Sequence, residues 1–450
     1  MSEGQRAWPE RPAAQQHERE APSTTSEPPT TGVSDADAER NRLFGAGVVD
    51  DPYPTYHRLR EACPVHPGTV EEHFPVPPGA AYTDRDQYSA FSYAACTDVF
   101  RRAQVFSSRW YDPNLTAFVG PTVIGMDEPE HNRMRMLLKD AFSKKAMRRW
   151  ETDIIRPTVD AHLQAVLPRG RADLYSEVAA KVPTLTIAGG LGLPAEDRQM
   201  FFDWAVAMTS AALPPEERFA AGQQVVEYVA PLVAERRRTP GDDLISILVN
   251  AEITDDDRAA EGYEGATHPL SDEEINAFIR LLIIAGAGTT YRAFGNLMLQ
   301  LLTHPDQLDA VREDRTLVDG AIHESLRLDQ PIAFLGRLAT EDTEVQGTPV
   351  RGGCPVNVVM GSANHDPDMF PEPERFDVRR ANADRHLTFG FGIHRCLGVN
   401  LALSELRILL GRTLDLLEDL RLDPDAGPVH VTGLGFRLPT SVPVVFRAAP

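Results

Sequence analysis

The segment SDEEINAFIRLLIIAGAGTTYRAFGNLMLQLL, Ser271 to Leu302, predicts a long buried helix. Ser271 and Glu274 stand three residues apart, which is the spacing of a capping box at a helix start. From Ile275 to Leu302 the residues are apolar on nearly every side, and at a rise of 1.5 Å per residue the helix would be about 45 Å long. Such a helix must be surrounded by protein, so we expect it to cross the middle of a domain.

The centre of this helix contains residues that disfavour helices. Gly286, Gly288, Thr289 and Thr290 follow one another closely there, and each glycine costs roughly 1 kcal/mol relative to alanine. Close packing against a neighbouring helix would explain the glycines. A large, flat ligand lying against this point would explain them equally well, so both interpretations stay open.

The rest of the chain predicts a mainly α fold with minor β structure. Apolar residues recur at helical spacing in the segments 128–167, 197–213 and 220–238. Short strand-like runs at 339–350, 354–364 and 440–448 predict small sheets at the edge. Residues 1–40 are rich in Pro, Ser, Thr and Glu and predict a disordered leader, so we expect a single folded domain over 41–450.

Charge and cysteine content exclude several functions. The formal net charge of -21 argues against nucleic acid or an anionic membrane as the main partner. The leader has no apolar run of the kind that a signal peptide or a membrane helix requires. Cys63, Cys96, Cys354 and Cys396 form no C-x-x-C pair, so neither a zinc site nor a disulfide framework is indicated. We expect a cytoplasmic protein.

One cysteine stands in a glycine-rich loop, FGFGIHRCLG, with the pattern Phe389-x-x-Gly392-x-x-x-Cys396-x-Gly398. Glycines on both sides let the backbone approach a planar ligand, and backbone N–H groups in such a loop favour a thiolate. The apolar segment 397–417 predicts a helix that begins beside the sulfur, where its dipole favours negative charge.

This loop resembles the cysteine-ligand signature of the cytochrome P450 family, F-x-x-G-x-x-x-C-x-G. The resemblance implies the P450 fold, with a long distal helix over haem b (iron protoporphyrin IX). It also implies that Cys396 is the axial thiolate of the iron and that Phe389 and Gly398 belong to the cofactor site. In the family this thiolate donates electron density to iron.

Further motifs match the family in order. HESLR contains Glu324 and Arg327, which look like the family's E-x-x-R motif. Their third partner would come from PEPERFDVRR, with Arg375 preferred over Arg380. The resemblance also implies four partners for the haem propionates, namely His131, Arg135, Arg337 and His394.

AGAGTT, Ala285 to Thr290, is similar to the family's oxygen-binding segment, in which an acid normally precedes the first threonine. Thr289 matches the catalytic threonine, but Gly288 stands where the acid should be. The motif therefore does not identify the route by which protons would reach the bound oxygen. The expected substrate pocket comprises Trp110, Phe118, Ala285, Gly288, Phe334 and Leu335.

The resemblance implies a soluble bacterial-type monooxygenase that oxidises a small hydrophobic molecule, such as a secondary metabolite, with O₂. The chain lacks a reductase domain, so electrons would come from a separate ferredoxin and ferredoxin reductase. A basic cluster that could receive the ferredoxin is Lys139, Lys144, Lys145, Arg148 and Arg149. Two alternatives remain: an atypical enzyme performing oxidative coupling, cyclisation or peroxide-driven oxidation, and a non-catalytic haem-binding sensor.

Overall fold

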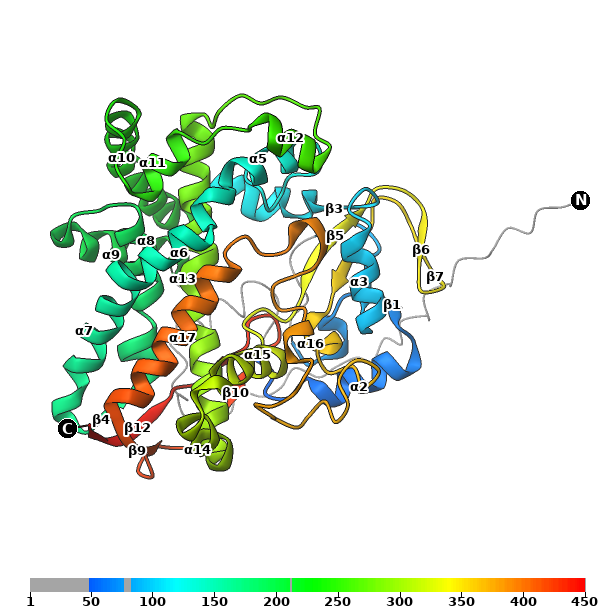
Figure 1. The fold of residues 1–450 in the computed structure, drawn as a ribbon. Coiled ribbons are helices and arrows are strands. Elements are labelled where there is room, and N and C mark those ends of the chain that lie inside the picture. The colour runs from blue at the N-terminus through cyan, green and yellow to red at the C-terminus, as the bar shows by residue number, and fades with distance from the viewer. Residues whose placement is uncertain (1–47, 77–81, 211–212, 450) are drawn as a thin grey trace, which may run out of the picture.

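The computed structural model describes residues 48–76, 82–210 and 213–449. The predicted leader, residues 1–40, lies outside this part. The described chain is mainly helical with small sheets, as predicted. Figure 1 shows the long helix α13 (Asp272–Thr303) running through the molecule with α17 (Val399–Leu416) beside it. Among the described residues, none of the helices combines the length and the apolar character that a membrane span requires.

Helix α13 begins as the sequence predicts. Ser271 accepts a hydrogen bond from the Glu274 amide, and the Glu274 side chain accepts one from the Ser271 amide, so both halves of the capping box form. Most of its side chains are buried, because α8 (Val182–Gly190), α10 (Pro215–Arg238) and α17 pack around it. The predicted central helix is therefore confirmed.

The other helices follow the predicted segments with more breaks. Segment 128–167 forms three helices instead of one continuous run, partly because Ser143 caps a new helix by accepting a bond from the Ala146 amide. The remaining helices are α2 (Tyr53–Ala62), α3 (Tyr93–Arg101), α4 (Ala117–Val119), α5 (Glu130–Leu138), α6 (Lys144–Trp150), α7 (Arg156–Val166), α9 (Arg198–Thr209), α11 (Leu244–Val249), α12 (Asp255–Glu261), α14 (Pro305–Glu313), α15 (Val318–Leu328) and α16 (Met360–Ala363).

The largest sheet has the strand order β1-β2-β8-β5-β3. Its strands are β1 (Val65–Pro67), β2 (Tyr88–Ala90), β8 (Pro355–Val358), β5 (Leu335–Ala339) and β3 (Phe106–Ser107). Only β2 and β8 in this sheet pair in parallel; the other neighbours are antiparallel. This register places Arg337 of β5 opposite Val356 of β8.

Three smaller sheets complete the β structure. The pattern 339–350 folds as the hairpin of β6 (Thr343–Val345) and β7 (Thr348–Val350). The pattern 440–448 forms β12 (Pro443–Ala448), which lies between β4 (Arg171–Asp173) and β9 (Leu417–Leu422). A short pair joins β10 (Val431–Thr432) to β11 (Leu438–Pro439).

Candidate functional site

The cysteine loop leads directly into α17, which begins at Val399. Gly390 and Gly392 have φ angles of 69° and 73°, in the left-handed region that favours glycine. A Cβ on Gly392 would also lie 2.6 Å from the Phe100 carbonyl oxygen of α3, so this position excludes side chains. The Cys396 amide donates to the Phe389 carbonyl at 2.7 Å and closes the loop.

Cys396 is exposed as a residue, whereas Cys96 and Cys354 are buried and Cys63 is half-buried. Desolvation by the surrounding protein raises the pKa of the Cys396 thiol. The Gly398 amide, Arg135 and Arg395 act in the opposite direction and favour the thiolate. The described part of the chain holds no group of three His, Cys, Asp or Glu side chains placed for a metal ion. Once ionised, the Cys396 thiol can serve as a metal ligand.

Four nitrogen-bearing side chains gather next to this loop. His131 and Arg135 come from α5, Arg337 from β5 and His394 from the loop itself. The rings of His131 and His394 have their centroids 4.1 Å apart. Burial, followed by the charges of His131, Arg337 and Arg135, lowers the pKa of His394 to about 2. The structure thus brings together all four predicted propionate partners.

The polar atoms of this cluster are only partly used in hydrogen bonds. His131 Nε2 is buried and has no hydrogen-bond partner among the residues that the structure describes. Arg135 Nη1 donates to the Arg395 carbonyl at 3.0 Å, and Arg337 Nη1 donates to the Gly336 carbonyl at 2.9 Å. Ser108, which the sequence analysis missed, lies with its Oγ 2.9 Å from His394 Nε2. Crowded cations and an unpartnered imidazole nitrogen suit a ligand that carries carboxylates.

On α13, Ala285 is exposed and Thr289 is partly exposed, although most of the helix is enclosed. The Thr289 hydroxyl donates to the Ala285 carbonyl at 2.8 Å, so it belongs to the same exposed patch. Gly286 packs on α8, where a Cβ would lie 3.1 Å from Ile187 Cδ1. Helix packing therefore explains Gly286, and Gly288 is buried.

The other predicted pocket residues have varied surroundings. The Trp110 indole covers Gly336, where a Cβ would lie 2.1 Å from its Cε2 atom, and it also stacks on Tyr82. The Phe118 ring faces the Arg218 guanidinium at 5.5 Å. Phe334 and Leu335 are half-buried and pack against two separate smaller clusters of apolar residues.

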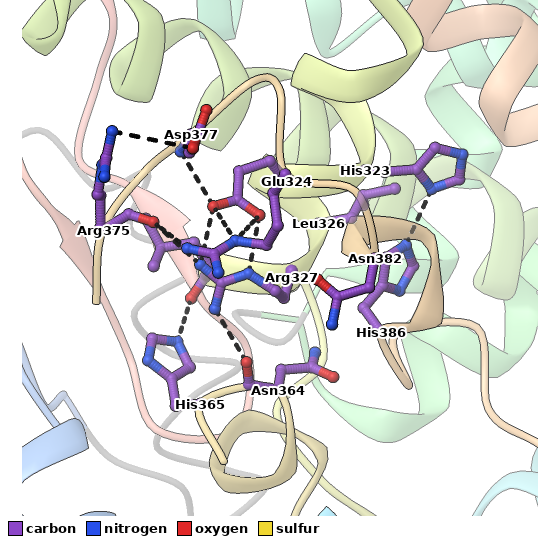
Figure 2. A network of polar contacts seen from close by, with 12 residues as sticks. His323, Glu324, Leu326, Arg327, Asn364, His365, Arg375, Asp377, Asn382 and His386 are labelled. Carbon is purple, nitrogen blue, oxygen red and sulfur yellow. Dashed lines mark hydrogen bonds and ion pairs between the residues drawn. The ribbon is translucent and has the colours of Figure 1, made fainter. Parts of the chain in front are cut away.

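The E-x-x-R pair forms a buried network, drawn in Figure 2. Arg327 Nε donates to Glu324 at 2.8 Å, and both side chains are fully buried. The prediction that Arg375 supplies the third side chain is wrong. Arg380 Nε lies 2.9 Å and 3.0 Å from the two Glu324 oxygens, whereas the Arg375 guanidinium is exposed. Arg375 contributes only its carbonyl, which accepts from Arg327 at 3.3 Å.

The basic cluster is partly neutralised. Lys139 pairs with Asp257, and Arg149 pairs with Asp242 at 3.3 Å and Asp153 at 3.6 Å. Lys145 and Arg148 are exposed on α6. This helix packs on α17, and α5 reaches the cysteine loop through Arg135, so the cluster lies on the cysteine side of the fold.

The central helix, the cysteine loop and the buried network are together those of a haem-thiolate oxidoreductase. The sequence model of the family described as Cytochrome P450 matches residues 200–429. The cytochrome P450 monooxygenase PikC of Streptomyces venezuelae is 34% identical over 416 residues, covering 90% of this chain and 91% of PikC. The steroid C26-monooxygenase of Mycobacterium tuberculosis is 35% identical over 381 residues, covering 82% of this chain and 97% of that protein.

Solved structures agree with the sequence relatives. CYP109E1 from Bacillus megaterium in complex with testosterone superimposes with a TM-score of 0.75 at 28% identity, covering 88% of this chain and 99% of that one. The chain therefore belongs to the cytochrome P450 family. It is a monooxygenase whose cofactor is haem b, and proteins of this family receive electrons from separate redox partners and act on small molecules.

Proposed function

We propose that Cys396 would bind the iron of haem b through its thiolate and that the enzyme oxidises a hydrophobic small molecule bound against α13. The exposed residue Cys396, in a left-handed glycine loop beside His131 and Arg135 of α5 and Arg337 of β5, carries the proposal. His131, Arg135, Arg337 and His394 would hold the two propionates, and the orphaned His131 Nε2 supports this role. Phe389 and Gly398 complete the cofactor site.

When bound, haem b supplies the oxidising chemistry, with O₂ and two electrons. The chain's own residues position the substrate and move protons. Gly288 has no side chain to donate a proton, so Thr289 would order a chain of water molecules beside it. The Thr289 hydroxyl donates to Ala285, and its oxygen remains able to accept a hydrogen bond from water.

The substrate class follows from the relatives. Two relatives are named a steroid C26-monooxygenase and a vitamin D(3) 25-hydroxylase. CYP109E1 has been solved with testosterone and with corticosterone. We therefore propose a largely apolar substrate for this chain, and a ferredoxin with its reductase as the electron source.

The assignment of Cys396 as the iron ligand can be tested by spectroscopy. The reduced, CO-bound protein should show the red-shifted Soret band of thiolate ligation, and Cys396→Ala should lose it. Cys63→Ala is the matched control, because Cys63 contacts only the Val65 carbonyl and the Thr348 hydroxyl in the structure's hydrogen bonds and should leave the band unchanged. Retention of the band in Cys396→Ala would exclude Cys396 as the ligand.

A further inference from the structure

Two arginines on neighbouring helices lack an anionic partner. Arg280 stands in the apolar first half of α13, between the buried residues Ile279 and Leu281, and Arg218 lies near the start of α10. Both are half-buried, and the Nε atom of each is buried without a hydrogen-bond partner. In the ranges that the structure describes, neither guanidinium forms an ion pair.

Both side chains lie near the junction of α4, α10 and α13. The Arg280 Nη2 atom lies against Gly120, where a Cβ would be 3.4 Å away, and Arg280 Cδ lies 3.9 Å from the corresponding point on Gly222. Gly222 follows Arg218 by four residues on α10, so both lie on one face of that helix. The Arg218 guanidinium lies over the Phe118 ring at 5.5 Å, which brings it to the same junction.

This arrangement is costly without a counter-ion. Burial lowers the pKa of Arg218, and no charged neighbour offsets this effect. Burial also lowers the pKa of Arg280, with only Glu273 acting against it. The chain has 66 acidic residues and 45 Lys plus Arg, and Arg237, near the other end of α10, does pair with Asp272 of α13 at 2.7 Å. Two partly desolvated cations at one junction therefore favour binding of an anion.

We propose that Arg218 and Arg280 bind a carboxylate of the substrate. The guanidinium group suits this role because it holds a carboxylate through paired hydrogen bonds. The inference rests on the proposed function, which places the substrate against α13 near Ala285 and Thr289. Arg280 precedes Ala285 by five residues, or about 7.5 Å along the helix axis. The substrate is thus an apolar molecule with an acid group on the order of 10 Å from the oxidised carbon.

The carboxylate site at Arg218 and Arg280 can be tested with probes whose imidazole group binds the haem iron, whatever the natural substrate is. We suggest ω-(imidazol-1-yl)alkanoic acids of increasing chain length and the primary amides of the same lengths, titrated into the haem-loaded enzyme. Imidazole binding shifts the Soret band, so the shift gives the affinity of each probe. At the best length the acid should bind at least about tenfold more tightly than its amide, because only the acid forms charge-assisted bonds.

Matched variants locate the acid group. In Arg280→Gln and Arg218→Gln the acid and amide affinities should approach each other within about threefold, while amide affinity stays unchanged. Arg280→Lys should keep part of the preference for the acid probe over its amide. Arg238→Gln, an exposed residue at the end of the same helix α10, should change neither affinity.

The outcomes separate the two proposals. Equal binding of acid and amide at every length, or an acid preference that survives in both glutamine variants, would overturn the carboxylate assignment alone. If no probe of either kind shifts the Soret band, the distal pocket of the proposed function is itself contradicted, and the assignment falls with it. Unchanged amide titrations in the variants show that loss of preference does not come from misfolding.

Discussion

Glu405 is a buried carboxyl group whose ionisation the fold opposes. It lies on α17, is 2% exposed, and has an Oε1 atom without a hydrogen-bond partner among the described residues. Burial raises its pKa to about 8, although the hydroxyls of Thr186 on α8 and Thr290 on α13 favour the ionised form. The side chain is therefore neutral near pH 7, which is unusual for a glutamate.

This raised pKa predicts a pH-dependent stability. In the unfolded chain Glu405 ionises above about pH 4.5, whereas in the folded protein it stays protonated until about pH 8. The unfolded state binds fewer protons in that window, so this group lowers the free energy of unfolding as pH rises from about 4.5 to 8. Glu405→Gln should remove this fall and stabilise the protein at pH 7 by on the order of 2 to 3 kcal/mol.

Urea unfolding at several pH values measures the effect as the difference in the free energy of unfolding between wild type and variant. Glu227→Gln is the matched control, because Glu227 is an exposed residue of α10. If the difference in the free energy of unfolding between wild type and Glu405→Gln stays constant from about pH 4.5 to 8, Glu405 is already ionised in the folded state.

Thr289 is expected to control how efficiently electrons are used. Replacing it with alanine removes the hydroxyl that would order water beside Gly288, so protons arrive less reliably, and positioned proton donors contribute about 10²- to 10⁴-fold in rate. In Thr289→Ala, the product formed per reduced nicotinamide should fall by roughly tenfold and hydrogen peroxide should rise. Haem content and substrate affinity should stay similar.

Thr303→Ala is a close control on the same helix. The Thr303 hydroxyl donates to the Leu299 carbonyl at 2.8 Å, the same local bond that Thr289 makes to Ala285. Both variants lose that bond, but only Thr289 lies beside Ala285 and Gly288 in the centre of α13, because Thr303 is its last residue. Equal product-to-nicotinamide ratios in Thr289→Ala and wild type would place the proton route elsewhere, in the substrate or another part of the pocket.

At the scale of elements, the Glu324 network joins α15 to the segment 371–380. Arg327 donates from α15 itself, and Arg380 donates from the segment 371–380. The buried Glu324 carboxylate therefore links the helix to the segment. Arg380 also donates to the carbonyls of Pro371 and Arg375, at 2.6 Å and 2.8 Å, which fixes the segment's own turn. Arg375, by contrast, faces solvent beside Glu372 and Asp377.

Arg380→Ala should therefore destabilise the protein far more than Arg375→Ala. Removing one partner of a buried ion pair costs about 3 to 5 kcal/mol, whereas exposed pairs contribute about 0 to 1 kcal/mol. Denaturant unfolding and haem content measure the two variants in parallel. Similar losses in both would mean that the Arg375 side chain, through Glu372 and Asp377, holds the segment as firmly as the Arg380 guanidinium does.

At the scale of the whole molecule, the sequence predicts the parts that depend on local pattern. The capping box at Ser271 and the glycine spacing around Cys396 are local features, and both form as expected. The preference for Arg375 over Arg380 was wrong, because the choice depends on which guanidinium the folded turn directs at Glu324. Arg280 gave a local signal as a charge in an apolar helix, but its lack of a partner is visible only once α10 and α4 are in place.

The acidic molecule still has an exposed basic region on its cysteine side. Asp257 and Asp242 neutralise part of the predicted cluster, so Lys145 and Arg148 on α6 are the residues that we expect to meet an acidic ferredoxin. Exposed charges act over about 8 to 10 Å before salt screens them. Reversing both, in Lys145→Glu with Arg148→Glu, should slow reduction by ferredoxin several-fold at low salt, and the difference from wild type should shrink as salt rises.

Stopped-flow reduction of the CO-saturated enzyme at several ionic strengths measures this rate. Arg421→Glu is the control, because Arg421 is an exposed residue of β9, which Figure 1 shows at the far end of the molecule from α5. Its reversal adds negative charge without touching α6, so it should slow reduction much less than the double variant. If both variants slow reduction equally, the net charge of -21 governs encounter, and no localised docking surface exists on α6.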